Sequence, residues 1–472
     1  MDVFITSYIT LSITHFEVAS RQDGYVSKTT DNHIGGLLRL RIRTARCGRT
    51  PKSNPGGSEL AESSLYGSAS APHMALHQHP ELSLHEKETS ARIANELVAA
   101  GFKVTTGIGG YGVVGVLQNG TGPVVLVRTD MDALPVTEQT GLPYASRVRT
   151  RDDQGDEVGV MHACGHDMHM AMFIGTARAL GRLKHRWSGT AVFVGQPSEE
   201  RVSGALAMLK DGLYSRFPRP NYCLAFHVDA GLEAGRIGVR EGYSMANVDT
   251  LKITIRGVGG HGAYPHLTKD PVVIAAEVIL ALQTIISREV RPIDPAVVTV
   301  GSIHGGTKNN IIPDRVELQL TLRSYDEKTR QLLLDAVKRI TVNIARAAGV
   351  PPDREPLIER VSDDYTPANY NDPALVRRLV PVWKRLFGDE NVVSRDPEMG
   401  GEDFSRYGLV EPRIPSFLIR IGAVDKQRIL AAMSMGMPLP SLHSPLFWPA
   451  QDPTLENGVI AMTAAVMELL PK

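Results

Sequence analysis

Two short clusters of side chains in this chain could bind metal ions or move protons. The denser one is His162–His169 (HACGHDMH), where Cys164 and His166 are one residue apart, so that a turn could direct both side chains at one ion. Thiolate and imidazole are ligands that suit zinc and similar metals. The turn precedes a predicted helix, Met168–Leu183, whose N-terminus favours a thiolate. This cluster therefore indicates a metal site.

Other interpretations of Cys164 are a core cysteine beside surface histidines, half of a structural zinc site, and a redox thiol. A structural zinc site normally has four Cys or His ligands in two close pairs. The other cysteines, Cys47 and Cys223, are far away in the sequence, so no second pair exists. We therefore favour a catalytic metal.

The second cluster is the pair Glu199-Glu200, which closely follows a predicted buried strand, Thr190–Val194. Adjacent carboxylates after a strand point in different directions. One can ligate a metal while the other accepts a proton from metal-bound water. A Glu-Glu pair alone is usually a solvated surface, but this pair lies at the same predicted sheet edge as Cys164. That position favours a catalytic role.

Three further histidines and one arginine are candidate site residues. His227 follows the apolar run 224–226 and is predicted to end a strand, and His443 lies in a loop near the end of the sequence. Taken singly, each is more often an ordinary hydrogen-bonded histidine. His261 lies in a glycine-rich loop, where the backbone can approach a ligand closely, although a simple loop has the same composition. Arg323 ends a predicted strand and could hold a substrate carboxylate, or be a surface arginine.

The predicted secondary structure explains how these residues could meet. Between about Met74 and Val248 strands and helices alternate, which is typical of an α/β sheet, and the polar clusters follow strand ends, where such sheets place their sites. Between Thr250 and Val361 the predicted order is βαββαβ, a ferredoxin-like unit. The α/β pattern resumes after Pro367.

We therefore predict an α/β fold with a split catalytic domain, whose central mixed sheet is flanked by helices, and an inserted ferredoxin-like lid or dimerisation domain. The predicted parts are a disordered extension at 1–70, the first part of the catalytic domain at 71–247, the lid at 248–364, and the second part of the catalytic domain at 365–472. A polar insertion at 149–157 is predicted to be a surface loop.

The first 70 residues have no sustained periodicity. An arginine-rich patch at 39–49 precedes a Ser/Gly/Pro-rich run at 50–70. A basic arm for nucleic acid and a displaced transit signal are alternatives, but the composition favours a disordered extension. The segment Gly67–His73 resembles an insertion that interrupts the expected first helix.

The composition excludes several classes of partner. Lys and Arg together number 51, as do Asp and Glu, so there is no global basic field for nucleic acid or an anionic membrane. No run approaches the roughly 20 apolar residues that span a bilayer, and Met1–Thr14 lacks the basic start of a signal peptide. Three cysteines cannot form a disulfide framework. We expect a cytoplasmic protein that binds neither nucleic acid nor membranes.

Several motifs together resemble the amidohydrolase branch of the aminoacylase/carboxypeptidase family of dinuclear metallopeptidases. This branch includes hippurate hydrolases, N-acyl-amino-acid hydrolases and auxin-conjugate hydrolases. The motifs occur in the family's order between about residues 75 and 470, and their combination is specific. They are Leu76–Leu82, Asp130–Pro135, Met161–Asp167, Glu199-Glu200, Gly259–Ala263, Asn310–Asp314, Gly401–Phe404 and Leu442–Pro445.

The resemblance implies two divalent metal ions, manganese or zinc, with cobalt and nickel as alternatives. It implies five metal ligands, with Cys164 as the bridge between the ions. The others are His166, Glu200, His227 and His443.

The resemblance also assigns roles around the metals. It makes Glu199 the general base, and it makes Asp132, with Asp130 second, the partner that orients His166. In the inserted domain, His261, Asn310 and Arg323 are implied to contact the substrate. The corresponding histidine in the family often reaches the active site of the partner subunit, so a homodimer is implied.

The predicted function is that of an enzyme, a hydrolase of linear amide bonds that removes the acyl group from small N-acyl amino acids. Metal binding would lower the pKa of a bound water toward about 7. Glu199 would take its proton and pass it to the leaving amine, and His261 would help to stabilise the oxyanion. The alternatives are a carboxypeptidase or dipeptidase with the same two-metal site, a non-catalytic dimeric binding protein, and a metal-independent cysteine hydrolase that uses Cys164.

Overall fold

The computed structural model describes residues 67–361 and 365–472. The predicted disordered extension therefore lies outside the described residues except for its last four, which begin helix α2 (Gly67–Gln78). The predicted interruption of the first helix by Gly67–His73 is wrong. Ala69 and Leu76 of α2 are buried in the main core, and α2 packs against helix α4 (His166–Arg182), so burial of these side chains stabilises the segment as a helix.

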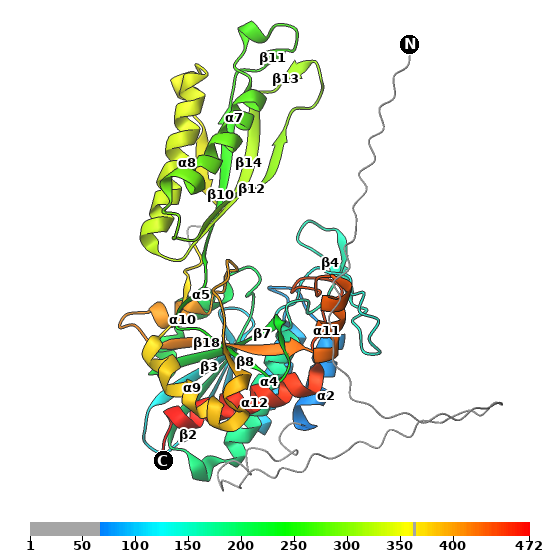
Figure 1. The fold of residues 1–472 in the computed structure, drawn as a ribbon, viewed down its shortest axis with the longest axis vertical. Helices are drawn as coiled ribbons and strands as arrows, with labels where there is room; N and C mark the ends of the chain where they lie inside the picture. Colours follow the sequence, from blue (N-terminus) through cyan, green and yellow to red (C-terminus); the bar gives the residue numbers. More distant parts are fainter. Residues whose placement is uncertain (1–66, 362–364) are drawn as a thin grey trace, which may run out of the picture. The chain divides into compact units, whose positions relative to one another are not determined.

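The main sheet has eight strands and is mixed, as predicted (Figure 1). Its four central strands pair in parallel with one another, whereas the first two strands pair in antiparallel fashion at one edge. β18 comes from the last part of the chain and lies between β7 and β8, so the sheet is assembled from both ends of the sequence. In spatial order the strands are β1 (Lys103–Ile108), β2 (Gly112–Asn119), β6 (Gly189–Gln196), β3 (Val124–Asp130), β7 (Tyr222–Glu233), β18 (Ser416–Val424), β8 (Ile237–Val239) and β17 (Val392–Ser394).

Helices cover both faces of this sheet. One core combines alternate strand residues with four long helices, and a second core combines the other strand residues with three short ones. Almost every residue of α4 is buried, which agrees with the apolar run Met170–Gly175 at the centre of this helix. The long helices are α3 (Lys87–Ala99), α4, α9 (Pro373–Phe387) and α12 (Gln451–Leu469), and the short ones are α5 (Gly204–Lys210), α6 (Leu213–Arg216) and α10 (Ser405–Leu409).

A second sheet of four antiparallel strands has the spatial order β12-β14-β10-β15 and its own core with two helices. The helices begin at aspartates whose side chains accept backbone N–H groups, Asp270 and Asp326. In chain order these elements are β10 (Asn247–Arg256), α7 (Pro271–Thr284), β12 (Ala296–Gly305), β14 (Arg315–Ser324), α8 (Glu327–Ala347) and β15 (Leu357–Arg360). This order is βαββαβ. The division of the chain into domains at residues 248 and 364 stays a prediction.

Smaller elements connect these layers. The predicted surface loop at 149–157 forms an exposed hairpin, whose strand pairing gives its backbone the partners that a loop would lack. Helix α11 (Lys426–Met435) has no buried residue. The short paired strands are β4 (Arg149–Arg151) with β5 (Glu157–Gly159), β9 (Gly242–Met245) with β16 (Asn369–Asn371), and β11 (Gly260–His261) with β13 (Ile311–Ile312).

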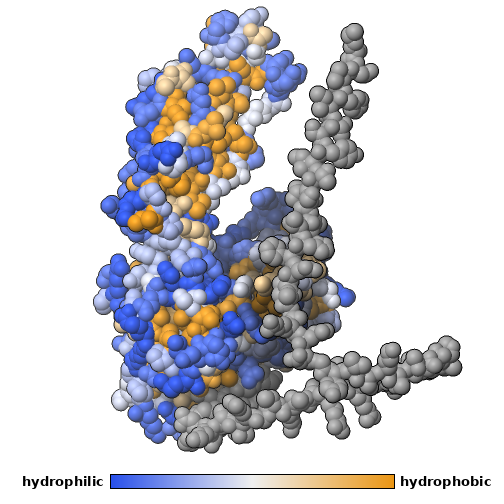
Figure 2. Space-filling view, viewed as in Figure 1, coloured by the Kyte–Doolittle hydropathy of each residue, from blue (hydrophilic) through white to orange (hydrophobic). Residues whose placement is uncertain are grey.

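Among the described residues, one helical stretch is long and apolar enough to cross a membrane by length and composition alone, Pro271–Glu289. This stretch is α7 with the short π-helix that follows it, Ile285–Glu289. Its inner side chains, such as Val278 and Leu282, are buried in the core of the second sheet, whereas Val273 and Leu280 are exposed. Figure 2 shows apolar side chains gathered over the face on which α7 lies in Figure 1.

Candidate active site

The turn before α4 directs two candidate ligands to the same place. Gly165, between Cys164 and His166, has a φ of 81°, in the left-handed region that favours glycine. A Cβ atom at this position would lie 2.6 Å from Cγ2 of Val228, so the turn needs a glycine for space as well as for backbone geometry. The local sequence therefore determines where both ligands point.

The ring of His166 is held by one nitrogen, and the other is left free. Its Nδ1 donates to the backbone carbonyl of Asp132, at 2.8 Å. Its Nε2 is buried without a hydrogen-bond partner, 3.7 Å from Oε1 of Glu200 and 3.8 Å from Oε2 of Glu199. Fixing Nδ1 as the donor leaves Nε2 as the nitrogen that can bind a metal.

His227 has the same arrangement. Its Nδ1 donates to the carbonyl of Val228 at 2.8 Å, and its Nε2 lies 3.6 Å from Sγ of Cys164. Burial and the charge of Arg420 lower the pKa of His227 well below its usual value, so the ring is neutral, as a ligand must be. The prediction that His227 ends its strand is wrong, because β7 continues to Glu233 alongside β18.

Asp132 organises the two glutamates. Its carboxylate oxygens accept the backbone N–H groups of Glu199 and Glu200, both at 3.0 Å, and the hydroxyl of Ser83 at 2.6 Å. The side chain of Asp132 therefore fixes the backbone that carries the two glutamate side chains. The main-chain carbonyl of Asp132 orients His166.

His443 reaches the cluster from the loop after α11. Its φ is 68°, its N–H donates to the carbonyl of Ala163 at 2.9 Å, and its Nε2 lies 3.5 Å from Oε2 of Glu200. Its side chain is 55 % exposed, unlike those of the other candidate ligands. A loop from the end of the chain is thus anchored on the turn that carries Cys164.

This donor set fits divalent metal ions. The sulfur, nitrogen and oxygen atoms converge in overlapping groups of three, and the orphaned Nε2 of His166 and Oε1 of Glu200 would gain a partner from a cation. Burial and neighbouring carboxylates raise the pKa of Cys164 above its usual value, and burial raises that of Glu200 to about 7. A bound cation would reverse both shifts, because metal ligands bind in their deprotonated forms.

Glu199, the candidate general base, lies next to the candidate metal ligands. Burial, Glu402 and Glu200 raise the pKa of Glu199 well above its usual value. A cation next to Glu199 would lower this pKa again and leave the carboxylate ionised.

Of the residues predicted to bind metal or to act as the general base, five line one cavity of about 420 Å³: Cys164, Glu199, Glu200, His227 and His443. His166 lies directly behind the lining, within 4 Å of both glutamates.

Arg323 also lines this cavity. Its Nε donates to Oγ1 of Thr321 at 2.9 Å, and burial lowers its pKa. Among the described residues it has no carboxylate partner, so its charge is available to a ligand.

His261 and Asn310 do not line the cavity. His261 lies on β11, Asn310 directly precedes β13, and both residues are exposed; Nδ1 of His261 accepts the N–H of Ala263 at 3.1 Å. The structure of one chain therefore does not bring them to the candidate ligands.

Two buried residues that the sequence analysis missed support the site from behind. His169 donates from Nδ1 to Oδ1 of Asp130 at 2.8 Å, and its Nε2 accepts the N–H of Val228 at 2.9 Å. It thereby links Asp130 to the strand beside His227. The signal was present in the sequence, because His169 follows His166 by three residues and so lies on the same face of the helix.

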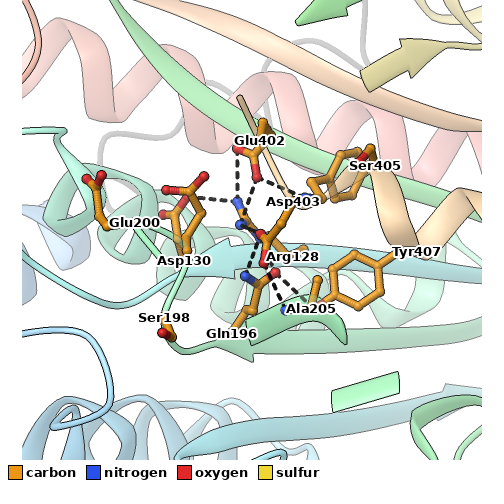
Figure 3. Close-up of polar contacts among 12 residues, drawn as sticks. Arg128, Asp130, Gln196, Ser198, Glu200, Ala205, Glu402, Asp403, Ser405 and Tyr407 are labelled. Atoms are coloured by element: carbon orange, nitrogen blue, oxygen red, sulfur yellow. Dashed lines mark hydrogen bonds and ion pairs between the residues drawn. The ribbon is translucent and has the colours of Figure 1, made fainter. Parts of the chain in front are cut away.

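The second missed residue is Arg128, at the centre of a buried network (Figure 3). It donates to Oδ2 of Asp130 at 2.7 Å, to Oε1 of Glu402 at 3.0 Å, to Oδ1 of Asp403 at 3.1 Å and to Gln196 at 2.9 Å. One guanidinium thus compensates three buried carboxylates and connects β3, β6 and the segment before α10. The motif that contains Glu402 was noticed in the sequence, but nothing there showed its partner.

Comparisons with known proteins agree with this geometry. Residues 126–432 match the model of Peptidase family M20/M25/M40. A thermostable carboxypeptidase of Saccharolobus solfataricus is 37 % identical over 73 % of this chain and 83 % of its own length. The IAA-amino acid hydrolase ILR1-like 2 of Arabidopsis thaliana is 34 % identical over 84 % of both chains. The N-acetylcysteine deacetylase of Bacillus subtilis is 34 % identical over 74 % of this chain and 86 % of its own length.

Solved structures show the same fold. A crystal structure of a protein from methicillin-resistant Staphylococcus aureus has a TM-score of 0.76 and 31 % identity, and covers 88 % of this chain and 100 % of its own. The YXEP protein of Bacillus subtilis, described as a dinuclear metal-binding peptidase of the M20 family, has a TM-score of 0.68 and 29 % identity over 87 % of this chain and 100 % of its own.

The chain therefore belongs to Peptidase family M20/M25/M40. Within that family it is a metal-dependent amidohydrolase or peptidase, a hydrolase that acts on amide bonds of small molecules. The predicted family, the α/β fold with its mixed sheet, and the prediction of an amide hydrolase are confirmed. The alternative of a non-catalytic binding protein is set aside.

Proposed function

We propose that this enzyme hydrolyses the amide bond of N-acyl amino acids. The observation that carries the proposal is one cavity lined by four candidate ligands, with the fifth, His166, directly behind them. The same cavity is lined by a separate buried carboxylate, Glu199, and by Arg323, which has no acidic partner among the described residues. The relatives named as an N-acetylcysteine deacetylase and an IAA-amino acid hydrolase support this substrate class.

Two divalent ions would be held by Cys164, His166, Glu200, His227 and His443, and the relative described as dinuclear supports the number. When bound, such ions polarise the amide carbonyl and acidify water. Manganese or zinc is proposed, with cobalt and nickel as alternatives, because a mixed N/O/S site does not select among them strongly.

The chain's own residues would perform the proton transfers and the positioning. Glu199 takes a proton from the attacking water and returns it to the leaving amine. Asp132 and Asp130 support the ligands from behind. Arg323 binds the carboxylate of the amino acid through its planar guanidinium, and its partly buried position strengthens that contact.

A carboxypeptidase or dipeptidase is the second candidate, because a relative named as a thermostable carboxypeptidase is 37 % identical. The two candidates differ in the group on the acyl side of the scissile bond. Rates on N-acyl amino acids and on dipeptides with the same C-terminal residue would distinguish them.

A homodimer is proposed for the working enzyme, because His261 and Asn310 lie outside the cavity of their own chain. In a dimer, one subunit would supply these two residues to the site of its partner, His261 to stabilise the oxyanion and Asn310 to bind the substrate. A cytoplasmic location stays a prediction, which cell fractionation would test.

The decisive experiment compares two adjacent, isosteric substitutions. Glu199→Gln is expected to retain bound metal and to lower kcat on N-acetyl and N-benzoyl amino acids about 10²- to 10⁴-fold, because it removes the proton acceptor. Glu200→Gln, the matched control, is expected to lose metal as well, because it removes a ligand. Metal content by mass spectrometry and steady-state rates provide the two readouts.

Chelation completes the test. Activity should disappear with a chelator and return with added Mn²⁺ or Zn²⁺. Activity that survives chelation would contradict the proposal and favour Cys164 as a nucleophile. Inactivity of the metal-loaded wild type on the whole set of N-acyl amino acids would equally overturn it.

A further inference from the structure

We propose that Arg420 makes this enzyme selective for substrates that carry a second carboxylate, in addition to the one on the α-carbon of the amino acid. Two arginines, Arg323 and Arg420, line the cavity that holds the candidate metal ligands. The inference rests on the proposed amide hydrolysis, since it names the substrate class of that same cavity.

The position of Arg420 is determined by the sheet. It lies on β18 directly opposite His227 of β7, and side chains of register partners on neighbouring strands lie on the same face. On its other side Arg420 faces Gly238 of β8. A Cβ atom at Gly238 would lie 2.9 Å from Cβ of Arg420, so the glycine leaves room for the arginine beside the metal ligand.

The charge of Arg420 is only partly compensated. The residue is 7 % exposed, and a buried guanidinium is costly unless its five N–H groups find acceptors. Its Nη2 donates to Oε2 of Glu398 at 2.9 Å, and among the described residues this is its single hydrogen bond. The side chain of Glu398 is 46 % exposed and also lines the cavity.

A neighbouring arginine pairs with its acid in a different way. Arg395 contacts both carboxylate oxygens of Asp229, through Nε at 2.8 Å and Nη2 at 3.3 Å, and it does not line the cavity. Arg420 instead combines one bond to a half-exposed acid with access to the cavity. Its remaining N–H donors can therefore receive a ligand without disturbing an ion pair to both oxygens of a buried acid, of the kind that holds Arg395.

The ligand group that fits these donors is a carboxylate. The planar guanidinium binds a carboxylate through two parallel hydrogen bonds, and such charge-assisted bonds are stronger than those to a neutral amide. Because Arg323 would hold the α-carboxylate, Arg420 would hold a second one. That group can belong to an acidic amino-acid side chain or to a dicarboxylic acyl group, and the two sources are separable by experiment.

The test measures kcat/KM on two matched pairs of substrates. The first pair is N-acetylglutamate and N-acetylglutamine, and the second is N-succinyl-leucine and N-succinamoyl-leucine. In at least one pair the dianionic member should be preferred by about 10- to 100-fold, as expected for a hydrogen-bonded charge. The pair that shows the preference identifies whether the amino acid or the acyl group carries the carboxylate.

Variants locate the preference. Arg420→Met should bring the ratio within the preferred pair close to one. Arg377→Met is the control, because it removes a surface arginine that pairs with Glu241 at 2.6 Å, and it should retain the ratio. Glu398→Gln should increase the ratio, since it removes the carboxylate that competes for Arg420, and this variant decides the question if Arg420→Met folds poorly.

The outcomes separate this inference from the proposed function. Hydrolysis of both members of each pair at equal rates would overturn the role of Arg420 and leave amide hydrolysis intact. A preference that persists in Arg420→Met, or that is unchanged or falls in Glu398→Gln, would also overturn it. No hydrolysis of any of the four substrates by the metal-loaded enzyme would overturn both.

Discussion

At the scale of single residues, the site depends on groups that never touch a substrate. His169 exchanges hydrogen bonds with Asp130 on one side and with the N–H of Val228 on the other. Since Val228 follows His227 directly, this histidine holds the backbone that presents a candidate ligand. His169 is therefore a positioning residue.

We predict that His169→Phe weakens metal binding about 10- to 100-fold, because the aromatic ring keeps the volume but neither hydrogen bond. Metal-titrated activity and the metal Kd are the measurements, and high metal concentration should restore much of the rate. Met170→Leu, a conservative change at the next buried position, is the control. An unchanged metal Kd in His169→Phe would contradict the assignment.

The sequence reveals the residues of this site unevenly. Cys164, His166 and the Glu199-Glu200 pair could be predicted because chemistry and spacing are concentrated within a few positions. Arg420 could not, because its partners, Glu398 and the cavity, come from strands and segments that meet only in the folded sheet. For the same reason the buried network around Arg128 has no signal in any single segment.

At the scale of elements, one histidine of α2 lies between two carboxylates from other parts of the fold. Nδ1 of His77 lies 2.7 Å from Oδ2 of Asp167 at the start of α4, and its Nε2 lies 3.1 Å from Oε1 of Glu138. Burial by itself would lower the pKa of His77, but the two carboxylates outweigh it and raise the pKa to about 10. Two further side chains lie beside this cluster. Nε2 of His73 is 3.0 Å from Oδ2 of Asp167, and the ring of Tyr144 contacts the ring of His77.

This arrangement predicts a pH dependence of stability. A raised folded-state pKa stabilises the protein fully below the unfolded value of about 6.5, and the stabilisation is lost as the pH rises toward about 10. The difference in Tm between wild type and His77→Gln should therefore be largest near pH 6 and shrink toward pH 10. Calorimetry across this range is the measurement, and a difference independent of pH would rule the charged histidine out.

Two helices pack through a glycine. A Cβ atom at Gly458 of α12 would lie 1.8 Å from Sδ of Met172 on α4. Gly458→Leu should therefore lower the free energy of unfolding by about 1–3 kcal/mol through overpacking. Glu456→Leu, an exposed position on the same helix, should have little effect. Equal Tm values for the two variants would contradict the prediction, because they would mean that α4 and α12 can move apart without a loss of stability.

Elements were predicted best where a pattern is local and long. The order βαββαβ was predicted between Thr250 and Val361, and the elements from β10 to β15 follow this order in the structure. Helix α2 was not predicted, because its sequence is rich in small and polar residues, and its helical state depends on burial against α4 and α12. The continuation of β7 past His227 likewise depends on pairing with β18.

At the scale of the whole molecule, the exposed face of α7 is the surface on which the proposed dimer would form. Val272, Val273 and Leu280 of this helix are 43 %, 55 % and 72 % exposed, and an exposed group of apolar side chains is typical of a protein–protein contact. β12 is the edge strand of the same sheet and leaves backbone groups for pairing. Leu280→Glu should therefore shift the enzyme from dimer to monomer in light scattering, whereas Glu277→Gln on the same exposed helix should not.

A second whole-molecule experiment asks whether subunits share a site. Glu199→Gln and His261→Ala are each expected to be inactive alone. Co-expressed, they should regain about one quarter of the wild-type rate, since half of the dimers are mixed and each mixed dimer contains one intact site. A mixture that stays inactive would mean that His261 serves its own chain or none.

The place of β18 in the main sheet has a consequence for synthesis on the ribosome. β7 and β8 are made before the whole of the second sheet, and β18, which must fit between them, is made after it. Until then the nascent chain holds two unpaired strand edges, the kind of surface that chaperones cover and that aggregates when left open. A premature stop codon anywhere before Ser416 therefore removes a central strand as well as His443. The truncated product cannot pair β7 and β8 with the strand that lies between them.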